Sequence, residues 1–92
     1  MEEKKRLRFR FTGMVQGVGF RYTAYHLASS LGLTGWVYND WDGSVLMEAQ
    51  GAAATISRLI ERLCSSTFIH IDGIEKKELP LEKQEPCFSI RY

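Results

Sequence analysis

Three glycines and one arginine lie in a run of nine residues that is the part of the chain best suited to chemistry. The run spans residues 13–21, with glycine at Gly13, Gly17 and Gly19, and it closes on Arg21. Glycine adopts backbone conformations that other residues avoid, so consecutive main-chain N–H groups can converge on one anion. An arginine at the start of a helix adds a permanent charge and a planar set of donors suited to phosphate or carboxylate. The run therefore predicts an anion-binding loop, although a glycine-rich turn with a surface arginine fits the composition equally well.

Two nucleotide-binding motifs that contain glycine loops do not fit this run. A Walker loop requires Gly-Lys followed by Ser or Thr, where this chain has Gly19, Phe20 and Arg21. A dinucleotide-binding fingerprint that began at Gly17 would need a small residue at the position of Tyr22. The expected anion is therefore not a nucleotide held by either motif.

The run resembles the first signature of the acylphosphatase family, a loop of the form G-x-V-Q-G-V-x-F-R that holds the phosphate of an acyl phosphate. Residues 35–51 resemble the family's second signature, since they begin with G-W-V-Y-N and continue with Gly43, Val45 and Gly51. Two motifs at the right separation seldom arise by chance. The resemblance extends from about Leu7 to Tyr92 and so covers nearly the whole chain.

This resemblance implies a hydrolase that cleaves the carboxyl-phosphate anhydride bond of acyl phosphates to a carboxylate and inorganic phosphate, by metal-free attack of a water molecule. It assigns phosphate binding to the loop residues Gln16, Gly17, Val18, Gly19, Phe20 and Arg21. Arg21 is then the catalytic arginine, and Asn39 places the attacking water. The expected partner is a small acyl phosphate, and no metal or other cofactor is implied.

Asn39 has a second explanation in terms of local structure alone. Asparagine before a hairpin turn commonly satisfies backbone groups and tolerates unusual dihedral angles. The resemblance favours the role in placing water over this explanation. The family often has a basic residue before this asparagine, whereas this chain has Tyr38. Help from a second cation in phosphate capture is therefore expected to be missing.

Length and charge favour one small domain without a polyanionic partner. The 92 residues suit a single core, so residues 1–92 are predicted to form one domain with residues 1–6 as a flexible N-terminus. The 12 basic and 11 acidic side chains leave a formal charge of +1, so we expect neither nucleic acid nor a membrane as partner. The opening residues lack the apolar run of a secretion signal, and we expect a monomer in the cytoplasm. Cys64 and Cys87 are then expected to be reduced thiols.

Hydrophobic periodicity predicts five strands and two helices. Strands are expected at residues 7–12, 35–39, 45–49, 69–72 and 88–92, and helices from residue 20 to about 31 and from about 56 to about 65. The charged residues 75–86 are expected to form a surface connection with a short extended piece near residues 79–81. The order βαββαβ with a terminal strand predicts an α+β, ferredoxin-like split βαβ sandwich, with two helices on one face of a mainly antiparallel sheet.

Several polar and aromatic residues outside the two signatures receive no chemical role. His26 is expected to be exposed, because it lies away from the apolar face of the first helix. His70 and Asp72 share one strand face, but two ligands are too few for a zinc or iron site. Trp36 and Trp41 are expected to line the site or the core. The tyrosines near the two signatures are expected to be partly buried packing residues: Tyr22, Tyr25 and Tyr38.

Two other functions are compatible with the predicted fold. A carbamoyl-phosphate-binding module of the kind found in hydrogenase-maturation proteins carries a similar loop, but it is joined there to a much longer chain, whereas this chain stops at Tyr92. An RNA-binding sheet would need exposed aromatic residues on its central strands. Residues 45–49 contain none, and Phe9 and Phe11 are expected to face the core. An acyl phosphate hydrolase is therefore the preferred interpretation.

Overall fold

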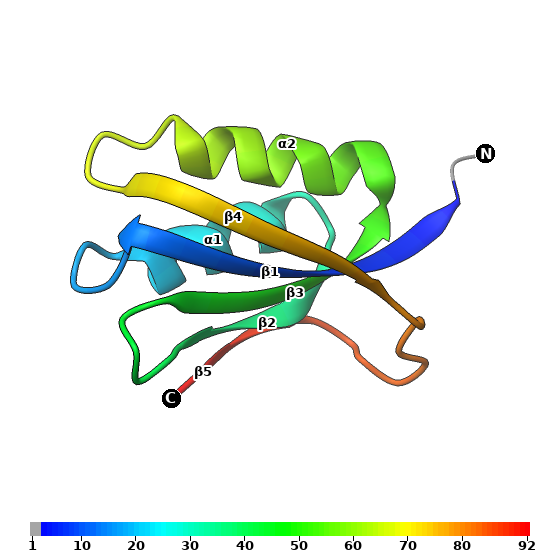
Figure 1. Ribbon diagram of the computed structural model, residues 1–92. Coiled ribbons are helices and arrows are strands. Elements are labelled where there is room, and N and C mark those ends of the chain that lie inside the picture. Colours follow the sequence, from blue (N-terminus) through cyan, green and yellow to red (C-terminus); the bar gives the residue numbers. More distant parts are fainter. Residues whose placement is uncertain (1–2) are drawn as a thin grey trace.

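Five strands form one sheet, and both helices lie against one of its faces in the computed structural model, which describes residues 3–92 (Figure 1). In chain order the elements are β1 (Lys4–Met14), α1 (Phe20–Ser30), β2 (Thr34–Asn39), β3 (Val45–Ala52), α2 (Ala53–Cys64), β4 (His70–Leu79) and β5 (Phe88–Arg91). The strands lie in the order β4-β1-β3-β2-β5, with β2 and β5 parallel and the other neighbours antiparallel. This arrangement confirms the predicted ferredoxin-like α+β plan.

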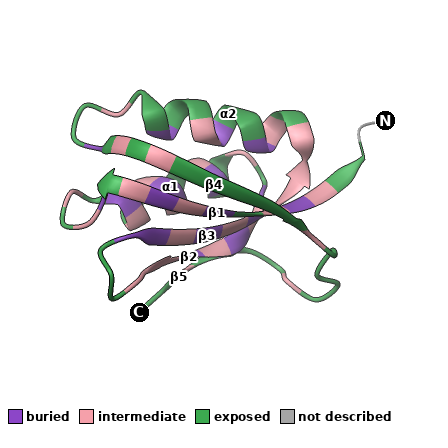
Figure 2. Cartoon of the chain, in the orientation of Figure 1, coloured by how far each residue is buried: buried purple, intermediate pink, exposed green. Residues whose placement is uncertain are grey.

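The core lies between the sheet and the two helices. Alternation along β1 turns Phe9 and Phe11 toward the helices, where they are 3% and 0% exposed. The buried residues of the helices recur at intervals of three or four, which are Ala24 and Ala28 in α1 and Ile56, Leu59 and Leu63 in α2. In Figure 2 the buried parts of α2 face the sheet, and its outer side is exposed. Neither described helix is long and apolar enough to cross a membrane.

Gly35 allows β2 to pair closely with β3. Its φ is 139°, and a Cβ atom at this position would collide with the carbonyl oxygen of Glu48. The pairing that this glycine permits places Asn39 opposite Val45 at the open end of the hairpin. The position of Asn39 therefore depends on a glycine four residues before it.

The first strand begins earlier than predicted. Residues 1–6 were expected to be flexible, but β1 starts at Lys4 and Arg6 is 4% exposed, so this expectation is wrong for residues 4–6. Arg6 donates hydrogen bonds to Glu85 at 2.8 Å and to Glu48 at 2.7 Å, and these two carboxylates raise the pKa of the guanidinium. Strand pairing together with this ion-pair network orders the segment. Residues 1–2 lie outside the described residues.

The fourth strand extends through much of the segment that was predicted to be a surface connection. β4 runs to Leu79, so residues 75–79 form a strand, and the connection is confined to residues 80–87. β4 lies at the edge of the sheet, and β1 is its one partner among the described strands. Because an edge strand exposes much of its surface, residues 75–79 lack the alternation of charged and apolar residues that marks a half-buried strand. The sequence pattern therefore did not predict this part of β4.

Candidate active site

A pocket of about 200 Å³ opens where the loop after β1, the start of α1, the end of β2 and the end of β5 meet. Its lining residues are Val15, Gly17, Gly19, Phe20, Arg21, Tyr22, Asn39, Ile90 and Tyr92. The structure therefore brings Arg21 and Asn39, 18 positions apart in the chain, to one cavity. Sequence reasoning had paired these two residues, whereas Ile90 and Tyr92 were not expected there.

The loop before α1 presents N–H groups that lack a backbone acceptor in the part of the chain that the structure describes. Gly17 and Gly19 have φ angles of 74° and 80°, and an added Cβ at either position would meet no atom within 4 Å. Glycine is thus required there by conformation and not by space. Among the described residues, the N–H groups of residues 16–19 donate no hydrogen bond to a backbone carbonyl. These donors are available to an anion.

The N-terminus of α1 adds further donors at the same place. Gly19 is the N-cap and makes no side-chain capping hydrogen bond, and the first turn contains no acidic residue. The first N–H groups of a helix have no intrahelical partner and carry a partial positive charge. No protein side chain therefore competes with an external anion for these groups in the described part of α1.

Arg21 extends from this turn and is held in place by the end of β5. Its Nη1 donates to the carbonyl oxygen of Arg91 at 3.3 Å, and its guanidinium lies 4.9 Å from the ring centroid of Tyr92. Across residues 3–92, Arg21 forms no ion pair with a carboxylate. Its positive charge is therefore positioned at the pocket but not neutralised there.

Asn39 lines the same pocket and contributes one acceptor. It ends β2 and points to the same face of the sheet as Val37. Its Oδ1 atom is buried, and no hydrogen-bond partner for it exists among the described residues. A buried acceptor without a partner is unfavourable unless water or a ligand supplies a donor. The atom is therefore suited to hold a water molecule.

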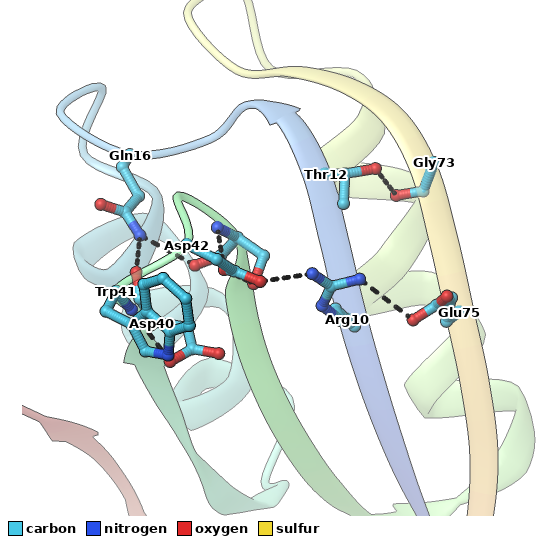
Figure 3. A network of polar contacts seen from close by, with 9 residues as sticks. Arg10, Thr12, Gln16, Asp40, Trp41, Asp42, Gly73 and Glu75 are labelled. Carbon is cyan, nitrogen blue, oxygen red and sulfur yellow. Dashed lines mark hydrogen bonds and ion pairs between the residues drawn. The ribbon is translucent and has the colours of Figure 1, made fainter.

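The side chain of Gln16 has a role that the sequence did not indicate. Its Nε2 donates to the carbonyl oxygens of Asp40 and Ser44, at 2.6 and 2.8 Å (Figure 3). These bonds tie the loop to the turn that follows Asn39. Gln16 therefore contributes only its backbone N–H to the loop's donors, and the side chain of Val18 is half-buried and packs against the core.

The turn that follows Asn39 is also fixed from its other side. Asp42 accepts hydrogen bonds from the side chain and the backbone N–H of Ser44, at 2.6 and 2.9 Å, and forms an ion pair with Arg10. Arg10 in turn reaches Glu75 of β4 (Figure 3). The hydrogen bonds from Ser44, followed by the contact with Arg10, lower the pKa of Asp42 to about 2. At neutral pH the turn is thus held by an ionised carboxylate.

Some of the aromatic residues lie elsewhere than predicted. Trp36 and Trp41 were expected to line the site or the core, but Trp41 is 94% exposed and neither lines the pocket. Trp36 lies on the sheet face that the helices leave open, with the guanidinium of Arg91 at 4.5 Å from its ring. Tyr22 was expected to be partly buried and is 66% exposed, because it lies at the mouth of the pocket. These positions depend on which face of its strand or helix carries each side chain, and a short aromatic-rich segment does not reveal that face.

The remaining predicted residues lie as follows. Tyr38 is half-buried on the open face of the sheet, on the other side of β2 from Asn39. His26 is exposed, as predicted, and His70 and Asp72 are exposed as well. Within residues 3–92 no three histidine, cysteine or acidic side chains are grouped so as to hold a metal ion. The two cysteines are exposed and form no disulfide, while their redox state stays a prediction.

The sequence that builds this pocket matches a known family. A family model described as Acylphosphatase matches residues 7–90. The chain belongs to the acylphosphatase family. It is 39% identical over 90 residues to an acylphosphatase of Lactobacillus johnsonii, a match that covers 96% of the chain and 99% of that protein.

A solved structure gives the same result for the fold of this acylphosphatase-family chain. The crystal structure of acylphosphatase from Bacillus subtilis superposes with a TM-score of 0.88 at 34% identity, over 96% of this chain and 99% of that one. The carbamoyltransferase HypF2 of Cupriavidus necator is 59% identical over 58 residues. That match covers 63% of this chain but only 7% of HypF2.

Proposed function

We propose that this protein hydrolyses acyl phosphates to a carboxylate and inorganic phosphate. The observation that carries the proposal is that one pocket brings together two kinds of unpaired polar group within residues 3–92: the loop N–H groups with Arg21, and the buried Oδ1 of Asn39. The match to a family of acylphosphatases over residues 7–90 supports the same reaction. The residue roles below are part of this proposal.

Phosphate binding is assigned to the loop and to Arg21. The N–H groups of residues 16–21 surround the phosphoryl oxygens, and the Arg21 guanidinium supplies a fixed charge and two parallel donors. These donors stabilise the charge that spreads over the equatorial oxygens in the transition state of phosphoryl transfer. Because the carboxylate is already a good leaving group, positioning and charge stabilisation suffice without a strong acid.

Water placement is assigned to Asn39. Its Oδ1 accepts a hydrogen bond from a water molecule and leaves a lone pair of that water directed at phosphorus. The new P–O bond forms as the bond between phosphorus and the acyl oxygen breaks, and the carboxylate leaves with the electron pair. Since neither a carboxylate nor an imidazole is among the residues that line the pocket, a phosphate oxygen of the substrate accepts the proton of the water. The step forms no covalent intermediate with the enzyme.

The proposal also covers cofactors, oligomeric state, location, partners and the effect of Tyr38. The reaction uses no metal and no other cofactor, and the protein acts as a monomer in the cytoplasm without nucleic acid as a partner. The near-neutral formal charge of +1 and the buried positions of Phe9 and Phe11 support the last point, since single-stranded RNA needs charge and exposed rings. Tyr38 in place of a basic residue is expected to weaken long-range capture of phosphate.

A second candidate is a carbamoyl-phosphate-binding module, which the high identity to part of HypF2 favours. The chain, however, spans 99% of the length of the Lactobacillus johnsonii acylphosphatase, so hydrolysis is the preferred function. Release of inorganic phosphate from acetyl phosphate, benzoyl phosphate and carbamoyl phosphate, measured with purified protein and with Arg21→Ala, tests both. Hydrolysis of all three that is lost in the variant supports the proposal. Tight binding of carbamoyl phosphate without phosphate release from any of them would favour the module.

A further inference from the structure

The pocket has a buried inner end and an aromatic outer rim. Val15 and Phe20 at the inner end are 1% and 2% exposed, and the Oδ1 of Asn39 is buried as well. Tyr22 and Tyr92 line the same pocket, yet they are 66% and 91% exposed. These exposures order the lining residues by depth. The Oδ1 of Asn39 lies at the buried end, and the two tyrosine rings lie where the pocket meets solvent.

The depth of Asn39 determines where the rest of the substrate must go. In phosphoryl transfer the attacking and leaving oxygens lie roughly in line, on opposite sides of phosphorus. A water held by the buried Oδ1 of Asn39 attacks from the inner side, so the leaving carboxylate faces outward. The acyl group attached to that carboxylate therefore passes through the mouth of the pocket, between Tyr22 and Tyr92.

Both rings at the mouth are held by neighbouring groups. The Tyr22 ring meets His26, one helical turn later, edge to face with centroids 4.2 Å apart. The Tyr92 ring lies against the guanidinium of Arg21 at 4.9 Å. Surfaces that are already ordered lose little conformational entropy when a ligand binds. Each contact favours one orientation of its ring before a substrate binds.

The chemistry of the rim favours an uncharged apolar group. Neither a lysine nor a second arginine is among the residues that line the pocket, and Arg21 is committed to the phosphate. A charged acyl group would thus find no opposite charge there, whereas an aromatic ring can pack against the tyrosines. Since the rim is open to solvent, it sets no upper limit on the size of the acyl group.

We propose that Tyr22 is a specificity-determining residue that, together with Tyr92, binds the acyl group and favours aromatic and other apolar acyl phosphates over small ones. This inference rests on the proposed hydrolysis of acyl phosphates. Contact with the acyl group persists from the bound substrate to the transition state, so it acts on KM more than on kcat. Inorganic phosphate has no acyl group, and its binding is therefore independent of Tyr22.

The test compares benzoyl phosphate, which carries a phenyl ring, with acetyl phosphate, which carries a methyl group. In Tyr22→Ala the ratio of kcat/KM for benzoyl over acetyl phosphate is expected to fall by about fivefold, through KM for benzoyl phosphate, as expected for the loss of one aromatic contact. Tyr22→Phe keeps the ring and should keep the ratio. The inhibition constant of inorganic phosphate should be the same in Tyr22→Ala and in the wild-type protein.

A matched control is Trp41→Ala, which removes an exposed ring near Asn39 that does not line the pocket; its ratio should equal that of the wild type. An unchanged ratio in Tyr22→Ala, or an equal loss with both substrates and with phosphate inhibition, would overturn the inference while leaving hydrolysis in place. A wild-type protein that hydrolyses neither substrate would instead contradict the proposed function, and the inference with it.

Discussion

Two segments that contribute to the pocket, here called its two sides, differ in how their polar groups are paired. On the first side, the loop before α1 keeps the N–H groups of residues 16–19 free of backbone acceptors among the described residues, and Arg21 has no carboxylate partner there. On the other side, the turn after β2 is bonded to both of its neighbours, through Gln16 and through Asp42. Asn39 is the exception on that side, since its Oδ1 has no hydrogen-bond partner within residues 3–92. One side thus holds many unused donors, and the other holds one unused acceptor.

This difference corresponds to two tasks within one reaction. A phosphoryl group carries several oxygens with spread charge, so the side that binds it needs many donors that are ready before the substrate arrives. A single water needs one acceptor whose position is fixed closely, since small displacements of a reacting atom cost rate. We propose that the unpaired groups mark where ligands bind and that the bonded turn fixes the position of Asn39. Substitutions on each side test this division.

Arg21→Ala is expected to have the largest effect, because it removes the fixed charge of the binding side. The loss of one donor to a developing oxyanion costs on the order of 10²-fold to 10³-fold in rate, and a charged bidentate group should cost at least that. Steady-state hydrolysis of an acyl phosphate measures the effect. Arg21→Lys should rescue poorly, and Arg8→Ala, which alters an exposed arginine outside the pocket, serves as the control. An Arg21→Ala protein that is folded and keeps more than about a tenth of the activity would remove Arg21 from the binding side.

Asn39→Leu distinguishes a role of Asn39 in catalysis from a role in the stability of the fold. The variant removes the acceptor and should lower kcat by about 10²-fold, while replacing a buried polar atom that lacks a protein partner with an apolar side chain of similar size should leave Tm equal or raise it. Thermal unfolding and steady-state kinetics on the same preparation provide the check. A large drop in Tm would show that Asn39 stabilises the hairpin, which is the explanation in terms of local structure.

Gln16→Met should have an intermediate effect, because it removes both hydrogen bonds between the loop and the turn at similar side-chain size. We expect kcat to fall by about tenfold through displacement of Asn39 relative to the phosphate, with the inhibition constant of phosphate little changed. Thr12→Val is the control, since the Thr12 hydroxyl bonds Gly73 outside the pocket (Figure 3). Equal losses in kcat and in phosphate affinity would place the Gln16 side chain on the binding side.

Asp42→Asn should have the smallest effect, and one that depends on pH. The Asp42 carboxylate has its pKa lowered from 3.8 to about 2, so it stabilises the folded state above pH 4, and this contribution is lost as pH falls through about 2. The difference in Tm between wild type and Asp42→Asn should therefore shrink between about pH 5 and pH 2. Asp72→Asn, whose carboxylate is exposed and forms no ion pair in residues 3–92, should show no such trend. A Tm difference that stays constant over this range would show that the ionised Asp42 carboxylate does not stabilise the turn.

Much of the fold followed from local patterns, and the resemblance of two segments to family signatures pointed to two residues that line the pocket. Alternation in residues 7–12 and the helical spacing after Phe20 predicted elements that the structure contains, and the glycine loop and the G-W-V-Y-N segment pointed to Arg21 and Asn39. The features that were not predicted depend on contacts between residues far apart in the sequence. The extent of β4 depends on its pairing with β1 at a sheet edge, and the entry of Tyr92 into the pocket depends on the parallel pairing of β5 with β2. Neither pairing leaves a signal in the residues themselves.

The side-chain contacts of Gln16 were hidden for a related reason. Its two acceptors lie 24 and 28 positions away, and they are backbone carbonyls that any residue would supply. Similarly, the 4% exposure of Arg6 depends on Glu85, which is 79 positions distant. A motif reveals residue types at fixed spacing, whereas contacts between distant backbone and side-chain atoms appear only when the chain is folded.

The measurement that most directly tests the division of the pocket is phosphate binding by Arg21→Ala and Asn39→Ala, followed as a shift in Tm. A ligand at about 100 times its dissociation constant stabilises the folded state by roughly 2.7 kcal/mol, which amounts to several degrees for a domain of this size. We predict this shift for the wild type and for Asn39→Ala, although the latter turns over poorly, and its absence in Arg21→Ala. A folded Asn39→Ala protein without the shift, or a folded Arg21→Ala protein that retains it, would contradict the assignment of binding to one side and water placement to the other.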